Sequence, residues 1–200
     1  MNAWRKTPTL VGRHMTLRPI APGDRDALVA VASAGDLWDT FYASVSQMKN
    51  ADAFMDKALR EHDSGWAMPF AVLDPGGTVV GTTRYFRMNP GHRRLELGGT
   101  FYAKSVQRTG VNTEAKLLLL THAFEVMDCQ CIQIRTDFFN KKSQAAIERL
   151  GAKRDGILRG HQIMADGRVR DSVVYSILEQ EWPGVRQNLA FLLARHQEKP

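Results

Sequence analysis

The chain has 200 residues, of which 44% are hydrophobic, and a formal net charge of +6. This length and apolar content suit one compact domain, since domains usually run to roughly 100–200 residues; we expect one domain over 1–200, with its core at about 14–182. No apolar run approaches the ~18 residues that a membrane helix requires, and the N-terminus lacks the apolar segment of a signal peptide, so we expect a soluble, cytoplasmic protein.

The first half of the chain predicts a strand, two helices and three strands. The first strand is expected around 15–19, and the helices follow near 23–33 and 52–62. Two apolar runs, 70–73 and 78–80, then flank the turn Asp74-Pro75-Gly76-Gly77, which is typical of a hairpin. After a second turn at Asn89-Pro90-Gly91, another strand is expected at about 94–101. The inner face of the first helix should be formed by Leu28, Val31 and Ala32.

A loop over Gln107–Ala115 runs directly into an apolar-striped helix that ends near Met127. A glycine in such a loop lets the backbone approach a ligand, and the free N–H groups of a helix's first turn attract phosphate. The alternative is an ordinary loop before an ordinary helix. Asn112 or Thr113 could serve as the N-cap. The buried face should consist of Ala115, Leu118, Leu119, His122, Ala123 and Val126.

The last third predicts strands and two further helices. A strand at 131–137 leads through Asn140-Lys141-Lys142-Ser143 into a helix that closes at Leu150-Gly151, where glycine suits the left-handed C′ position. Tyr175 and Asp171 lie in a β-branched strand pattern, and we assign them structural roles. A terminal helix at about 183–197 should cover the sheet or pair with a second subunit. Its apolar stripe is Val185, Leu189, Leu192 and Leu193. The order is βααβββαβαββ plus a C-terminal helix, an α/β fold with a mixed sheet.

These segments together resemble the GNAT superfamily of acyl-CoA-dependent N-acetyltransferases. The family's pyrophosphate loop reads Gln/Arg-x-x-Gly-x-Gly/Ala, and here it is Gln107-x-x-Gly110-x-Asn112, with Asn112 departing from the small residue. The wider pattern is similar to the ribosomal-protein alanine/serine N-acetyltransferases. It includes Thr113-Glu114-Ala115, Asn140-x-x-Ser143 before Glu148-Arg149-Leu150-Gly151, and Asp166-Gly167 before Asp171–Ser176. The resemblance covers about Thr16 to Trp182.

The resemblance implies acetyl-CoA as cosubstrate, held where two strands diverge, with Gly98-Gly99 marking a bulge at that gap or a simple bulge without ligand. It implies cofactor-binding roles for several residues. Main-chain groups of Thr100, Phe101 and Tyr102 would hold pantetheine, and Asn140 would bind it through its amide. The phosphates would lie on the loop and on two basic side chains: Gln107, Arg108, Thr109, Gly110, Val111, Asn112, Thr113 and Lys142.

Transfer of an acetyl group to an amine needs a proton acceptor and a proton for the departing thiolate. Glu96 could accept the amine's proton through water; alternatively it is a strand carboxylate paired with Arg84 or Arg94. Ser143 matches the family serine near the thioester sulfur, although a serine there could equally be an N-cap. The favoured acceptor is a protein N-terminal amine, because an α-amine with pKa ~8 needs little help from a base.

The composition leaves other acceptors and partners open. The alternatives are a small amine (an amino acid, a polyamine or an antibiotic) or a non-catalytic acyl-CoA-binding or RNA-associated module. The basic residues are spread along the chain, so nucleic-acid binding is not favoured. Cys129 and Cys131 are expected to be unpaired thiols, and the six histidines form no metal-binding motif, so no metal is expected. The acceptor entrance should be lined by Trp38, Phe41, Tyr42 and Trp66.

Overall fold

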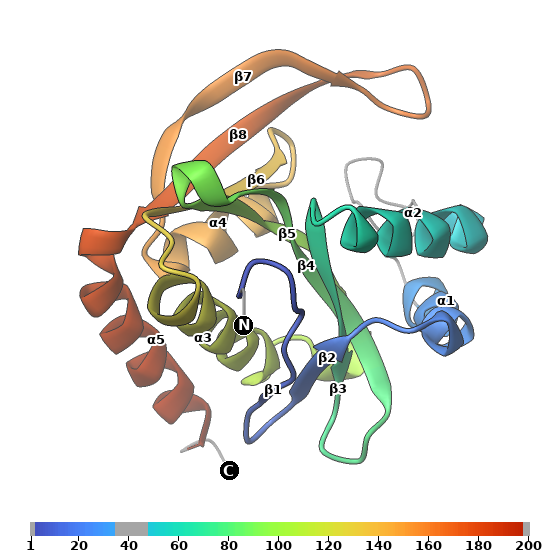
Figure 1. The fold of residues 1–200 in the computed structure, drawn as a ribbon, viewed down its shortest axis with the longest axis horizontal. Helices are drawn as coiled ribbons and strands as arrows, with labels where there is room; N and C mark the ends of the chain where they lie inside the picture. Colours follow the sequence, from blue (N-terminus) through green and yellow to red (C-terminus); the bar gives the residue numbers. More distant parts are fainter. Residues whose placement is uncertain (1–2, 35–47, 198–200) are drawn as a thin grey trace.

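A computed structural model describes residues 3–34 and 48–197, arranged as one large mixed sheet with helices on both faces (Figure 1). The strands are β1 (Leu10–Val11), β2 (Thr16–Pro19), β3 (Ala67–Leu73), β4 (Val79–Asn89), β5 (Arg94–Tyr102), β6 (Cys131–Asp137), β7 (Lys153–Ile163) and β8 (Val169–Leu178). The main helices are α1 (Arg25–Ser33), α2 (Ala51–Asp63), α3 (Val111–Thr121), α4 (Lys141–Leu150) and α5 (Trp182–Gln197). The predicted order is confirmed, with the two-residue strand β1 added before it.

The eight strands are ordered β1-β2-β3-β4-β5-β6-β8-β7. Every pairing is antiparallel except that of β5 with β6, which is parallel and extends only from Arg94–Glu96 to its partners Cys131–Gln133. Beyond these three pairs the two strands separate, as the family resemblance implied. The register of β5 against β4 shifts beside Gly99, whose φ of +60° is a left-handed conformation that glycine adopts at little cost, so the expected bulge is confirmed.

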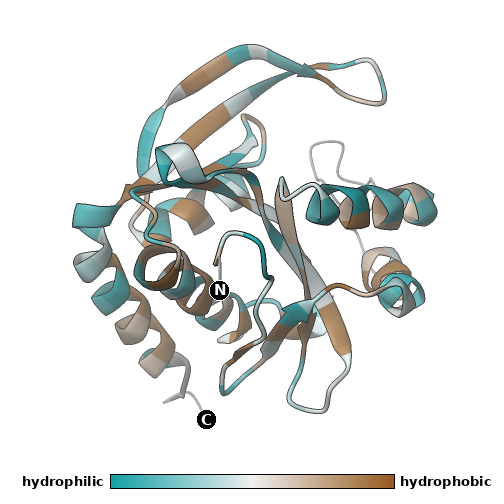
Figure 2. Ribbon diagram, in the orientation of Figure 1, coloured by the Kyte–Doolittle hydropathy of each residue, from teal (hydrophilic) through white to brown (hydrophobic). Residues whose placement is uncertain are grey.

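Helices cover both faces of the sheet (Figure 1). Helices α1 and α2 pack on β3 and β4, and α3, α4 and α5 lie on the opposite face, where α5 packs against α3. Apolar residues follow the central strands and α3, whereas α2 is largely polar (Figure 2). Leu28, Val31 and Ala32 are buried as predicted. On α5, Val185 and Leu189 are buried, so the terminal helix covers α3.

Helix α3 differs from the predicted amphipathic stripe. The predicted helix continues past α3 as a π-helical turn over His122–Val126, where Val126 is 60% exposed. Within α3, Glu114 and Lys116, outside the predicted apolar face, are buried. The helix is enclosed on more than one side because it lies between the sheet, α5 and the N-terminal segment. The Glu114 carboxylate accepts hydrogen bonds from the backbone N–H groups of Arg13 and His14, at 2.8 and 2.6 Å, and so attaches that segment to the helix.

Two expected helix caps were wrong and one was confirmed. Helix α3 begins at Val111 with Gly110 as its N-cap, so neither Asn112 nor Thr113 has that place. In α4 the cap is Asn140, whose Oδ1 accepts from the Ser143 N–H at 3.0 Å; the alternative that Ser143 is the N-cap is therefore wrong. Gly151 ends α4 in the left-handed conformation, with φ of 103°.

Trp38, Phe41 and Tyr42 lie outside the described residues. Cys129 is buried and Cys131 is half-buried, and both are free thiols. Within residues 3–34 and 48–197, no helix is long and apolar enough to cross a membrane, and no group of three metal-ligating side chains gathers.

Candidate active site

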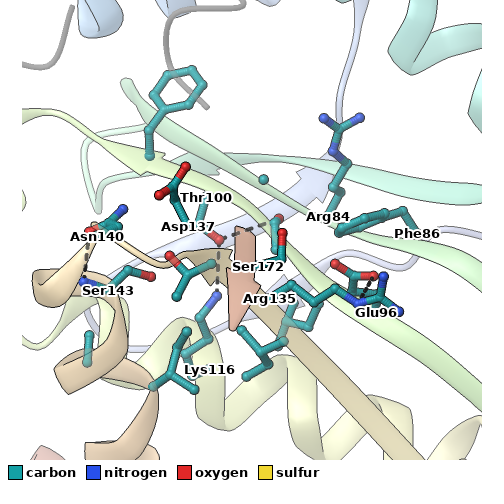
Figure 3. Close-up of a pocket in the computed structure, with 18 of the residues that line it drawn as sticks. Arg84, Phe86, Glu96, Thr100, Lys116, Arg135, Asp137, Asn140, Ser143 and Ser172 are labelled. Carbon is teal, nitrogen blue, oxygen red and sulfur yellow. Dashed lines mark hydrogen bonds and ion pairs between the residues drawn. The ribbon is translucent and has the colours of Figure 1, made fainter. Parts of the chain in front are cut away.

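A cavity of about 660 Å³ occupies the gap where β5 and β6 separate (Figure 3). One half is lined by the N-terminal ends of α3 and α4, and the other by α2, β4 and the β7–β8 hairpin. Past Glu96, β5 has no partner strand on its β6 side, so main-chain groups of Leu97–Tyr102 face the gap. The cavity therefore joins two chemically different halves through a strand edge that can pair with a bound molecule.

The first half, which we call the cofactor half, is formed by two helix N-termini and the loop before α3. The predicted residues that line it are Gln107, Arg108, Asn112, Asn140, Lys142 and Ser143. Gln107 Nε2 donates to the Tyr102 carbonyl at 3.0 Å, which fixes the loop to the end of β5. Arg108 has a left-handed backbone, with φ of 63°. Two helix N-termini and cationic side chains facing one cavity suit a polyanion, since both attract negative charge.

Four of the predicted loop residues do not line the cavity: Thr109, Gly110, Val111 and Thr113. Val111 and Thr113 are buried in the protein interior. A Cβ on Gly110 would lie 3.2 Å from both His14 and Leu193, so the glycine permits close packing of the loop on β1–β2 and α5. The loop therefore borders the cavity through Gln107, Arg108 and Asn112, while its glycine faces His14 and Leu193.

A buried lysine lies at the junction of the two halves. Lys116 Nζ, from the second turn of α3, donates to Thr100 Oγ1 at 3.1 Å, and that hydroxyl is 2.7 Å from Thr83 Oγ1 (Figure 3). Lys116 is 7% exposed, and burial lowers its pKa to about 8. Thr100, Phe101 and Tyr102 also line the cavity here. The junction therefore offers hydroxyl and ammonium donors beside the unpaired edge of β5.

The second half, the acceptor half, contains Glu96. Its carboxylate is 5% exposed and lies 3.3 Å from Arg135 Nε and 3.6 Å from Arg87 Nε. The expected partners Arg84 and Arg94 are therefore wrong as its direct ion pairs; Arg84 Nη1 instead binds Glu61 at 3.1 Å. Burial raises the pKa of Glu96, while the nearby arginines, Arg135 first, act to lower it.

Sequence reasoning missed Lys116 at the junction and the residues that make up most of the acceptor half: Arg84, Arg87, Arg135, Asp137, His161 and Arg170. In β6 the alternation of Ile132 and Ile134 with Gln133 and Arg135 indicates two faces, and the polar face was available as a signal. Only the separation of β5 from β6 turns that face toward a cavity instead of solvent. Trp66, which was expected at the acceptor entrance, does line this half.

Comparison with known proteins places this fold and cavity in a class. The chain matches the family described as "Acetyltransferase (GNAT) domain" over residues 14–153, and it belongs to that family. It is an N-acetyltransferase of a family that uses acetyl-CoA.

Its relatives indicate a branch within the family. It is 26% identical over 185 residues, 87% of this chain and 96% of the relative, to "Putative ribosomal N-acetyltransferase YdaF" of Bacillus subtilis (strain 168). A GCN5-related N-acetyltransferase from Brucella melitensis superposes with a TM-score of 0.83 at 27% identity, covering 94% of this chain and 86% of that one. Mycobacterium smegmatis RimJ in complex with CoA-disulfide shares the fold, with a TM-score of 0.75 at 20% identity, covering 95% and 96%.

Proposed function

We propose that this enzyme acetylates the N-terminal α-amine of a protein or peptide, using acetyl-CoA bound in the cofactor half. The observation that carries the proposal is the buried carboxylate of Glu96 on the acceptor side of the unpaired edge of β5. A carboxylate whose pKa is raised by burial is a better proton acceptor than an exposed one.

In this mechanism the chain's own residues bind, orient and move protons. Main-chain groups of Thr100–Tyr102 hold the pantetheine arm, and Arg108 and Lys142 face the phosphates at the helix N-termini. Glu96 takes the amine's proton through water as the new C–N bond forms. Ser143 passes its hydroxyl proton to the sulfur as the C–S bond breaks and takes up a proton from water in the cavity, while Glu96 returns the amine's proton to that water, so that one proton moves in all from nitrogen to sulfur. Acetyl-CoA, when bound, supplies the activated thioester.

The α-amine is favoured over lysine because the proton acceptor is a single carboxylate held between arginines. An α-amine has a pKa of ~8 and a lysine ~10.4, so a much larger fraction of the former is neutral at pH 7. The name of YdaF, "Putative ribosomal N-acetyltransferase", agrees with a protein acceptor. A small primary amine is the second candidate, supported by the modest cavity of about 660 Å³.

A panel of acceptors tests the proposal. Release of CoA thiol would be followed with a lysine-free peptide with a free N-terminus, the same peptide N-terminally blocked and containing one lysine, spermidine, free amino acids and an aminoglycoside. We expect the free N-terminus to give the highest kcat/KM. A faster reaction with the blocked lysine peptide or with a small amine would reject the N-terminal acceptor while leaving the acetyltransferase intact.

A further inference from the structure

The acceptor half carries more positive than negative charge, in a regular arrangement. Among the described residues, three carboxylates of this half are each shared between two cations. The groups are Glu61 with Lys57 and Arg84, Glu96 with Arg87 and Arg135, and Asp137 with Arg168 and Arg170. Each group, counted by itself, therefore contains one more cation than carboxylates.

The two groups nearest β6 are well removed from water. Glu96 and Asp137 side chains are 6% and 1% exposed, and Arg135 and Arg170 are 16% and 17% exposed. Arg170 Nε lies 3.6 Å from Asp137 Oδ2, which is already bound by Arg168 at 2.7 Å. Unneutralised charge that is this poorly hydrated is costly unless a further anion or water approaches it.

Hydrogen bonding leaves Arg170 better able than Arg135 to bind such an anion. The buried Nε groups of both arginines face carboxylates, at 3.3 Å from Glu96 and 3.6 Å from Asp137, so an anion would bind their Nη groups. Arg135 Nη2 already donates to Gln133 Oε1 at 3.1 Å, whereas the Arg170 side chain makes no hydrogen bond among the described residues. His161 lies 3.4 Å from Arg135 Nη1 and does not neutralise it, because burial and the same arginines lower the pKa of the imidazole. Guanidinium groups bind carboxylates with paired, charge-assisted hydrogen bonds.

The cofactor does not account for this charge. The cations of its half are Arg108, from the loop before α3, and Lys142, from α4, with Lys116 of α3 at the junction. In Figure 3, Asn140 and Ser143 lie at one end of the cavity and Glu96 with Arg135 at the other, with Lys116 and Thr100 between them. The surplus of positive charge beyond Glu96 therefore faces the second substrate.

We propose that the acceptor half binds a carboxylate that the acceptor itself carries within a few atoms of its amine. The inference rests on the proposed function, because it takes Glu96 as the point where the amine docks. Arg135 contacts Glu96 directly, so an anion held by Arg135 and Arg170 is adjacent to the reacting nitrogen. Such a carboxylate belongs either to a peptide whose first or second residue is acidic or to a free amino acid. Polyamines are excluded by repulsion from the same charges.

Matched acceptors separate charge from shape. We would compare kcat/KM for peptides that begin with Asp or Asn and are otherwise identical, a third that begins with Lys, and free aspartate with free asparagine. The carboxylate should be preferred over the amide by at least about tenfold, and the preference should weaken with salt. A preference within the peptides identifies an acidic N-terminus as the source; one confined to the free amino acids identifies a small-molecule acceptor. Equal rates, or faster reaction of the Lys peptide, would overturn the inference.

Substitutions of Arg135 and Arg170 test whether these arginines cause the preference for a carboxylate. Arg170→Gln leaves Asp137 paired with Arg168, and Arg135→Gln leaves Glu96 beside Arg87, so neither leaves a carboxylate without a cation. Each variant should lower the ratio of kcat/KM for the Asp peptide to kcat/KM for the Asn peptide toward one. The KM for acetyl-CoA should stay unchanged. The control is Arg159→Gln, because Arg159 also pairs with a carboxylate of the β7–β8 hairpin but is 88% exposed and outside the cavity wall. An unchanged ratio in both cavity variants would reject the assignment.

A binding measurement keeps this test separate from that of the proposed function. Calorimetric titration of the Asp and Asn peptides into the enzyme in the presence of CoA requires no transfer. Tighter binding of the Asp peptide, lost in Arg170→Gln, supports the inference even if no N-terminus is acetylated. Equal binding overturns it even if transfer is fast. Faster transfer from succinyl-CoA than from acetyl-CoA, without acceptor preference, would instead assign the arginines to the acyl group and also overturn it.

Discussion

Lys116 carries its charge at a place where charge is poorly solvated. Its pKa of about 8 lies below the ordinary value near 10.5, so the folded state releases this proton more readily than the unfolded state does. Between pH 8 and 10.5 the unfolded chain binds more protons, and stability from this group rises with pH. At ~1.4 kcal/mol per pKa unit, the charged form destabilises the fold by about 3 kcal/mol below pH 8.

Lys116→Met should therefore raise the free energy of unfolding at pH 7 by up to about 3 kcal/mol, because it removes the buried charge and keeps the apolar stem. The gain over the wild type should shrink as the pH rises from 8 to 10.5. Urea unfolding across that pH range measures it. Lys104→Met, at an exposed lysine, is the control and should change stability by less than about 0.5 kcal/mol. A gain that is constant with pH would contradict the lowered pKa.

Glu96 is the second residue whose chemistry can be tested alone. Glu96→Gln keeps the size of the side chain but cannot take a proton, so turnover at pH 7 should fall about 100-fold, in the range typical of a lost general base. The KM for acetyl-CoA should change little, because Glu96 lies in the acceptor half. The deficit should narrow above pH ~8, where an α-amine is already neutral. Steady-state kinetics from pH 6.5 to 9 measure this, and unchanged turnover would remove Glu96 from the mechanism.

At the scale of a single element, α4 places one side chain in two roles. Asn140 caps the helix through Ser143 N–H and also lines the cofactor half. Asn50 caps α2 in the same way, accepting from Ala53 N–H at 3.1 Å, but does not line the cavity. This pair separates the stabilising contribution of a cap from binding.

Asn140→Ala and Asn50→Ala should each lower the free energy of unfolding by about 1 kcal/mol, the usual contribution of an N-cap. Only Asn140→Ala should also raise the Kd for acetyl-CoA, because only it removes an amide from the cofactor half. Chemical denaturation and calorimetry give the two quantities. If both variants, or neither, weakened acetyl-CoA binding, Asn140 would have no direct contact with the cofactor.

Local sequence patterns predicted the helices, strands and turns well, but predicted the burial and the contacts of their side chains less well. The turn at Asp74–Gly77 and the left-handed Gly151 were read correctly because turn chemistry is encoded in neighbouring residues. The exposure of Val126 was predicted wrongly, because periodicity shows that one face of a helix is apolar but not how many neighbours enclose the helix. The arginine partners of Glu96 were missed because they come from β4 and β6, which approach β5 only in the folded sheet.

At the scale of the whole molecule, the sheet has a weakly paired seam between β5 and β6. Strands β5 and β6 share three residue pairs, whereas β6 and β8 share seven. Beyond Glu96, β5 has no partner strand on its β6 side among the described residues, although β5 stays paired with β4 as far as Tyr102 and β6 stays paired with β8 as far as Asp137. A cofactor that pairs with β5 in the gap would join the two parts of the sheet.

Acetyl-CoA should therefore slow amide hydrogen exchange most at Leu97–Tyr102, with a smaller effect at Ile134–Asp137, because binding supplies the missing partner for β5. Exchange in β3, which is paired on both sides, should hardly change and provides the internal control. At ~100 times its Kd the cofactor should also add ~2.7 kcal/mol to global stability. ATP and NAD at equal concentration test whether the protection needs the pantetheine arm. Protection confined to the N-termini of α3 and α4, with none along β5, would mean that the phosphates bind but the arm does not enter the seam.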